Sequence, residues 1–145
     1  MKEELVTFKV ALLAKDKGFE NTEWSKLGRN YYNHKGEVNG NCIELVKAVC
    51  RKEDTEEFRT IDAPTQSLLQ RWLREEHNIF INIGIDQTTY PKYCYQISRF
   101  IGNPKDLSAE EWDWEDIPPS SDWGLYRTYE QALEKGLLKA LKLIK

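Results

Sequence analysis

Apolar side chains recur at helical spacing in three segments of the chain, residues 8–17, 64–77 and 129–144. In each segment, apolar positions three or four residues apart form a stripe along one side, and polar or charged residues fill the rest. A helix on the surface of a folded domain has this pattern because only one of its sides packs against the core. The sequence therefore predicts three amphipathic helices. Gly136 interrupts the apolar side of the third, which predicts a close approach to another backbone.

The residues at the ends of these segments support the helix assignments. Thr7, Asp62 and Thr128 stand where an N-terminal cap accepts a backbone N–H, and Pro64 suits a first turn, where its missing N–H costs nothing. Gly18 follows the first segment and is suited to the left-handed conformation that ends many helices. Each predicted helix therefore has residues at its ends that are typical of helix boundaries.

A period of two indicates strands elsewhere in the chain. Residues 79–86 alternate isoleucine with other residues, and residues 93–98 alternate Tyr and Ile with Cys, Gln and Ser. Two consecutive strands with a short connection pair antiparallel, and their semi-polar second faces indicate that one side of the sheet meets water or a partner.

Residues 33–37 predict a hairpin turn with Gly36 at positive φ. Residues 42–50 fit either a strand or a short helix.

These elements together predict the α+β class. We expect one domain over residues 1–145, with a small antiparallel sheet and the helices packed mainly on one of its faces. The chain has 40% hydrophobic and 31% charged residues, which excludes collagen-like, low-complexity and disulfide-scaffold proteins. It has three cysteines without a C-x-x-C spacing, no apolar run of membrane-spanning length and no signal-peptide pattern. The expected location is therefore the cytoplasm, with no membrane span.

Residues 106–123 differ in composition from the rest of the chain. They hold seven acidic residues, no Lys or Arg, and three of the five tryptophans. The formal charge of −3 becomes +4 without those seven acids, so the rest of the chain is mildly basic. We interpret this segment as an acidic, Trp-rich insertion, a solvated loop anchored by its tryptophans. Aromatic side chains are enriched in binding hot spots. The candidate binding residues are Trp112, Trp114 and Trp123, with Tyr93 and Tyr95 from the sheet.

The sequence holds no pattern typical of catalysis. The two histidines, His34 and His77, fall at a predicted turn and at a helix end, positions that favour solvent exposure or capping over a general base. Neither they nor the cysteine pair Cys42 and Cys50 have the spacing of a metal site. No phosphate-binding glycine motif is present in the sequence. We therefore predict a non-enzymatic protein with no catalytic residue, cofactor or metal ligand.

Two segments resemble a known group of sequences. These are Ala-Pro-Thr-Gln-Ser-Leu-Leu-Gln-Arg-Trp-Leu-Arg-Glu-Glu-His-Asn-Ile at residues 63–79 and Tyr-Glu-Gln-Ala-Leu-Glu-Lys-Gly-Leu-Leu-Lys-Ala-Leu at residues 129–141. They, and residues 7–19, are similar to small uncharacterised proteins encoded by bacterial phages, prophages and other mobile elements. The first run is specific, whereas the second is a common helix pattern; residues 21–60 and 106–123 are not matched. The resemblance implies a cytoplasmic accessory protein of phage or mobile-element type, with no activity or site residue to carry over.

Two functions follow from these observations. The favoured one is a non-enzymatic protein–protein interaction module, which presents its sheet or its acidic segment to a protein partner or to a second copy of itself as a homodimer. The alternative is a nucleic-acid-binding accessory protein that uses its mildly basic body. The sequence has no basic run and no nucleic-acid-binding motif, so this alternative is less favoured. Its candidate residues are Arg71, Arg74 and Arg99.

Overall fold

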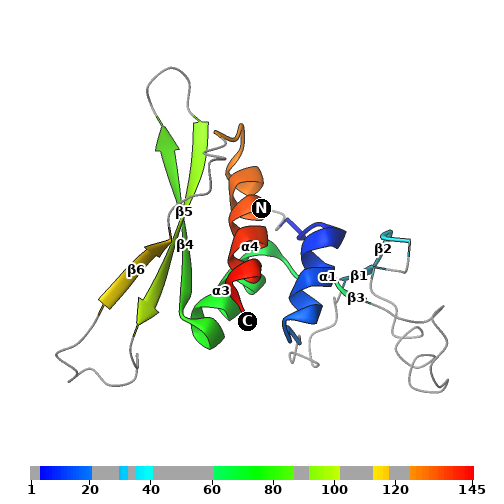
Figure 1. The fold of residues 1–145 in the computed structure, drawn as a ribbon. Coiled ribbons are helices and arrows are strands. Elements are labelled where there is room, and N and C mark those ends of the chain that lie inside the picture. The colour runs from blue at the N-terminus through cyan, green and yellow to red at the C-terminus, as the bar shows by residue number, and fades with distance from the viewer. Residues whose placement is uncertain are drawn as a thin grey trace. The chain divides into compact units, whose positions relative to one another are not determined.

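A computed structural model describes residues 4–20, 30–32, 35–40, 61–86, 92–101, 113–117 and 125–145. The chain forms two compact units, Met1–Thr65 and Gln66–Lys145, and each is described by itself. Helices and antiparallel strands are mixed in both, which confirms the α+β class (Figure 1). The single domain over residues 1–145 stays a prediction. The segment 42–50, for which strand and helix were both open, lies outside the described residues.

The first unit contains one helix and one small sheet. The helix α1 (Phe8–Asp16) is followed by β1 (Asn30–Tyr32), β2 (Val38–Gly40) and β3 (Ile61–Asp62). The sheet has the order β2-β1-β3, and both neighbouring pairs are antiparallel. The predicted hairpin is thereby confirmed, and Gly36 has the expected positive φ of 79°.

The ends of α1 follow the sequence signals in part. Gly18 has a φ of 87°, and the N–H of Phe19 donates to the carbonyl of Ala14, so the helix ends in the left-handed turn that was expected. Thr7 occupies the N-cap position, but its side chain makes no capping hydrogen bond. The Phe8 ring lies edge-on to Tyr32 at 5.4 Å between centroids, and the Tyr32 hydroxyl donates to the carbonyl of Val6.

The second unit is a three-stranded sheet with two helices. Its elements are α3 (Gln66–His77), β4 (Ile79–Asp86), β5 (Lys92–Ile101), β6 (Asp113–Ile117) and α4 (Tyr129–Leu143). The sheet has the order β4-β5-β6, with all pairs antiparallel and β5 in the centre. The predicted pairing of the two alternating segments is therefore confirmed.

Helix α3 begins two residues later than expected, so the proposed cap and first-turn proline are wrong. Asp62 lies in β3, and Pro64 precedes the helix. The carbonyl of Pro64 accepts a hydrogen bond of 3.0 Å from the N–H of Val6, and Leu5 and Thr65 form an antiparallel bridge. Pairing with the N-terminal segment therefore keeps this stretch extended.

Both helices of the second unit cover the same face of its sheet. Ile79, Ile81, Ile83 and Ile85 of β4 share this face with the odd-numbered residues of β5, because directly paired residues of antiparallel strands point to the same side. Side chains from both layers form a core in which none exceeds 4% exposure. Its members are Leu69, Leu73, Ile79, Ile81, Ile97, Leu133, Leu137, Ala140 and Leu141. The expected packing of helices on one face is thus confirmed for this sheet.

A buried glutamine joins the two helices of this layer. The Gln66 side chain is only 7% exposed, and its Nε2 donates to the Glu130 carbonyl at 3.1 Å and to Glu134 Oε2 at 3.0 Å. A buried amide without such partners would destabilise the fold. Gln66 therefore ties the first residue of α3 to the first turns of α4.

Gly136 is a point of close approach between α4 and the sheet. A Cβ atom built on this residue would lie 2.8 Å from Ile81 Cγ2 and 3.3 Å from Tyr95 Cβ. The predicted close approach is present, but it is made to side chains of β4 and β5 rather than to another backbone. Any larger residue at this position would push α4 away from the sheet.

The turn between α3 and β4 contains a left-handed residue. Asn78 has a φ of 54°, a conformation that asparagine tolerates better than most residues, and its carbonyl accepts the N–H of Phe100 at 3.0 Å. We expect Asn78→Ala to lower the free energy of unfolding by about 1 kcal/mol, because alanine is strained at this φ. Asn78→Gly should leave the stability unchanged or raise it. Urea denaturation of both variants measures the difference, and an equal loss in both would contradict this explanation.

Part of the acidic segment is a strand, so the solvated loop expected there is wrong for residues 113–117. They pair with β5 as an edge strand, with Ile117 opposite Ile97, and Ser98 Oγ donates to Asp116 Oδ1 at 2.8 Å. Pairing of the backbone outweighs the unfavourable strand propensity of the acidic side chains. Trp112, Trp123 and the remainder of the segment lie outside the described residues.

Candidate functional site

Tyr93 and Tyr95 lie near the start of β5, on the face of the sheet that α4 covers. Their direct neighbours on β4 are Ile85 and Ile83. Tyr126 pairs with Tyr93 on the other side, and the two residues exchange both backbone hydrogen bonds at 2.8 Å. This pairing brings residues from three parts of the chain to one corner of the unit, where β4 ends, β5 begins and α4 begins (Figure 1).

Four tyrosines meet at this corner as two ring pairs. The rings of Tyr93 and Tyr129 lie edge to face with centroids 6.4 Å apart, and those of Tyr95 and Tyr126 are tilted by 31° with centroids 6.2 Å apart. Such separations are within the range of favourable aromatic contacts. Tyr93, Tyr95, Tyr126 and Tyr129 are referred to below as the tyrosine cluster.

Local structure holds the cluster in place. The Thr128 side chain accepts a hydrogen bond of 3.1 Å from the N–H of Gln131, which fixes Tyr129 as the first residue of α4. This part of the capping prediction is confirmed. Tyr126 is held by the two backbone bonds to β5, and Tyr95 lies against Gly136 of α4. Regular secondary structure and backbone hydrogen bonds therefore hold the cluster, so little conformational entropy of the four tyrosines is lost when a partner binds.

Several large apolar side chains at this corner are open to solvent. Tyr129 is 44% exposed, Ile85 is 54% exposed and Leu125 is 40% exposed. The tyrosine ring offers apolar surface, and its hydroxyl can donate or accept a hydrogen bond. Such side chains are enriched where proteins bind other proteins. The corner can therefore bind a partner by contact and hydrogen bonding.

Sequence reasoning found only half of this cluster. Tyr93 and Tyr95 were candidates from the alternating pattern of their strand, and the structure brings them together. Tyr126 was not singled out. Tyr129 is the first residue of the apolar stripe over residues 129–144, which predicts that it is buried, but 44% of its surface is exposed. One sequence signal was available: tyrosines stand near the start of the predicted strand at residues 93–98 and near the start of the predicted helix at residues 129–144.

The three tryptophan candidates are not brought together by any described contact. Trp112 and Trp123 lie outside the described residues. Trp114 lies in β6, where its backbone is in register with Phe100 of β5. Their role in binding stays a prediction.

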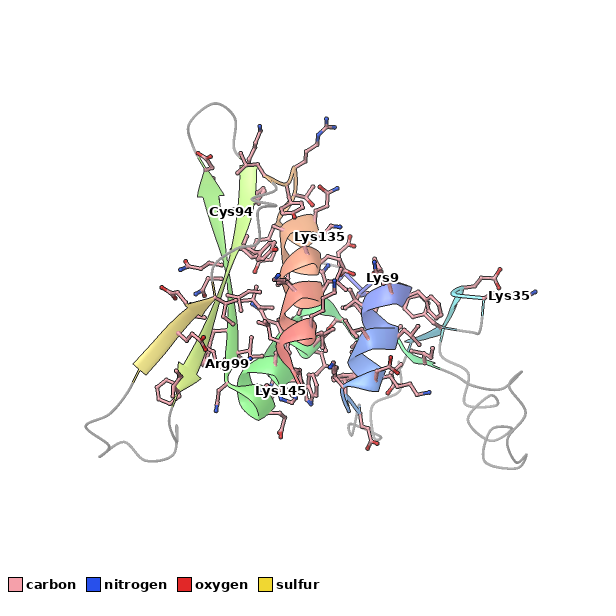
Figure 2. The ribbon with its side chains drawn as sticks, in the orientation of Figure 1. Lys9, Lys35, Cys94, Arg99, Lys135 and Lys145 are labelled. Atoms are coloured by element: carbon pink, nitrogen blue, oxygen red, sulfur yellow. The ribbon has the colours of Figure 1, made fainter. Side chains whose placement is uncertain are left out.

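The three candidate arginines are used differently from one another. Arg71 is exposed on α3 and its Nε donates to Glu75 Oε1 at 2.8 Å, one turn further along the helix. Arg74 is exposed on the same helix. Arg99 is half-buried, and its Nη2 donates to the carbonyl of Leu143 at 3.2 Å, where a positive charge suits the end of α4. Figure 2 shows Arg99 at the end of β5 away from Cys94.

His77 lies at the end of α3, as expected. Its ring packs edge-on to Trp72 with 4.5 Å between centroids. Burial lowers the pKa of His77, the nearby charge of Arg99 lowers it further, and Glu76 opposes both. The side chain is therefore predominantly neutral at pH 7 and serves in packing.

No metal centre or membrane span is visible in the described ranges. Within residues 4–20, 30–32, 35–40, 61–86, 92–101, 113–117 and 125–145, no group of three or more His, Cys, Asp or Glu side chains is placed to hold a metal ion. Across those same residues, no helix has the length and apolar character needed to cross a membrane.

Comparison with known proteins adds no relative. A scan against protein-family models, a search of curated proteins and a search of solved structures each found no match to the chain. The functional argument therefore depends on the geometry of the tyrosine cluster.

Proposed function

We propose that this chain is a non-enzymatic protein–protein interaction module that binds its partner through the tyrosine cluster. The supporting observation is the open aromatic corner. Tyr129, Ile85 opposite Tyr93, and Leu125 next to Tyr126 each leave 40% or more of their surface exposed. Exposed apolar surface held by ordered structure is typical of binding sites. We further propose, from the resemblance noted above, that the module is a cytoplasmic accessory protein of phage or mobile-element type.

The chemistry of the corner indicates the kind of partner. Tyrosine rings stack on apolar and planar groups, and their hydroxyls add hydrogen bonds at the rim. A protein surface with one or two protruding apolar side chains and nearby backbone carbonyls fits this corner best. Arg71 and Arg99 already contact groups of this chain, so the arginines add less to the nucleic-acid alternative than their number implies.

The test is capture of partners from a lysate of the native host, followed by affinity measurement with the partner identified. We expect Tyr129→Ala to weaken binding at least about tenfold, because truncating an aromatic hot spot costs more than about 1.4 kcal/mol. Ile101→Ala is the matched control, since Ile101 is 49% exposed at the other end of β5. Its affinity should stay within about twofold of the parent.

Three outcomes would contradict the proposal. Equal affinity of the Tyr129→Ala variant and the parent would remove the cluster from the interface. Loss of binding only on alanine substitution of Trp112, Trp114 and Trp123 would move the site to the acidic segment. Salt-dependent retention of DNA or RNA that is lost with Arg71→Ala and Arg74→Ala would favour the nucleic-acid function instead.

A further inference from the structure

The outer edge of β4 presents backbone hydrogen-bonding groups. The N–H of Phe100 donates to the carbonyl of Asn78, so even-numbered residues of this segment bond to β5. Bonded and unbonded pairs alternate in an antiparallel ladder, so the odd-numbered residues of β4 point their N–H and C=O groups away from β5. A hydrogen bond from Gln70 confirms that odd-numbered residues of β4 point their backbone groups away from β5. Its Nε2 donates to the carbonyl of Ile81 at 2.8 Å. Ile83 and Ile85 therefore point their backbone groups away from the sheet.

The two edges of this sheet differ in their protection against strand addition. β6 carries Asp113, Glu115 and Asp116, and two prolines follow it in the sequence. Charge and proline are the usual means by which proteins block edge pairing. β4 has neither from Ile79 to Ile85. In the part of the chain that the structure describes, no strand pairs with the outer edge of β4. The open edge is thus the neutral, β-branched one.

We propose that β4 pairs antiparallel with β4 of a second copy of this chain, with Gly84 of each copy facing the other across a two-fold axis. In this register Ile83 of each copy lies opposite Ile85 of the other. Each such pair exchanges two backbone hydrogen bonds, which makes four in total. The sequence Ile83-Gly84-Ile85 reads the same in both directions, so the edge is complementary to itself.

The charges and shapes near the axis fit a second copy. Asn82 lies opposite Asp86 of the other copy, so the Asn82 amide can donate to the Asp86 carboxylate. The same register keeps the two Asp86 carboxylates apart. Gly84 has no side chain to separate the strands at the axis. Ile85, 54% exposed in one copy, gains an apolar neighbour. The pairing ends before Ile81, whose carbonyl already accepts from Gln70.

The expected dimer is reversible. Four backbone bonds and two isoleucine pairs form an interface well below the roughly 1,200 Å² of a stable complex, so a dissociation constant on the order of ten micromolar is expected. The dimer extends the sheet to six strands and places both tyrosine clusters on the same face, which makes the module bivalent. Ile85 borders both surfaces, because it also lies opposite Tyr93 of the tyrosine cluster. The dimer depends on the backbone edge of β4 and partner binding depends on Tyr129, so the dissociation constant of the dimer and the partner affinity of Tyr129→Ala test the two proposals separately.

Sedimentation velocity of the full chain at roughly 1 µM to 1 mM tests the pairing over the range expected for this affinity. The parent should form a dimer, and Ile85→Lys should raise its dissociation constant at least about tenfold, because a charged edge strand resists pairing. Ile101→Lys is the matched control: it makes the same change at an exposed isoleucine of the same sheet, and its dissociation constant should stay within about twofold of the parent. A parent that stays monomeric, or an equal effect of both variants, would overturn the proposal.

A second variant checks the register without depending on the lysine change. Gly84→Cys combined with Cys94→Ser should form a disulfide that joins two copies at position 84, because unbonded antiparallel pairs have Cα atoms about 4.5 Å apart. The serine is needed because Cys94 Sγ lies 3.2 Å from where the Cβ of residue 84 would be. Peptide mapping should find the 84–84 link in the oxidised dimer. Absence of that link while the dimer persists would overturn the proposed register.

Discussion

Replacing Leu137 by alanine should lower the free energy of unfolding of the second unit by about 2–5 kcal/mol. Leu137 has no exposed surface and lies in the middle of α4, in the layer that covers the sheet. Its truncation removes apolar contacts and leaves a cavity between rigid elements, and both effects destabilise the fold. Urea denaturation followed by circular dichroism measures the change.

The neighbouring residue is a control for this substitution. Leu138 lies in the same helix but is half-buried. The same truncation there should cost about 1 kcal/mol or less, because less apolar surface is lost from the interior. If Leu137→Ala and Leu138→Ala were equally destabilising, α4 would not pack on the sheet in the orientation described.

Replacing Gly136 by valine should lower the free energy of unfolding by about 3 kcal/mol. A Cβ at this position lies 2.8 Å from Ile81 Cγ2, and the two further methyl groups of valine enlarge the conflict. The helix must then move away from β4 and β5, which loosens the core beneath it. Lys135→Val is the control, because Lys135 is exposed in the same helix and tests only the lower helix propensity of valine.

A compensating change separates steric conflict from other causes. Ile81→Ala removes the Cγ2 atom that a Cβ at position 136 would meet. In that background Gly136→Ala should be clearly less destabilising than in the parent, since only the contacts with Tyr95 Cβ at 3.3 Å and Cγ at 3.4 Å remain and alanine is the better helix former. In the parent it should be destabilising. If Gly136→Ala had the same effect in both backgrounds, the contact with Ile81 would not explain the glycine.

The fold was predictable where one period ran through a whole element. The isoleucines of residues 79–85 and the apolar stripe of residues 129–144 specify a strand and a helix locally, so both appear as expected. β6 escaped prediction because Asp-Trp-Glu-Asp-Ile has too many charges to show an alternating pattern. Its strand conformation comes from pairing with β5, which no local pattern reveals.

The candidate site was less predictable because it too depends on contacts between residues that are far apart in the sequence. Tyr93 and Tyr126 are joined by a single pair of backbone bonds across 33 positions, and such a bridge has no sequence signature. Tyr129 follows the helical period of a buried residue, yet it lies at the corner where the sheet ends and remains exposed. Similarly, Asp62 has the chemistry of a helix cap but is held in a strand by pairing with residue 31.

The order of the elements along the chain has a consequence for how the second unit reaches its native state. During synthesis α3, β4, β5 and β6 are all made before α4, which covers the isoleucine face of the sheet. Until that helix arrives, Ile81, Ile97 and the edge of β4 remain accessible to other chains, and such surfaces promote aggregation. The yield of native protein should therefore fall when translation outpaces chaperone capture, even where the finished fold is stable.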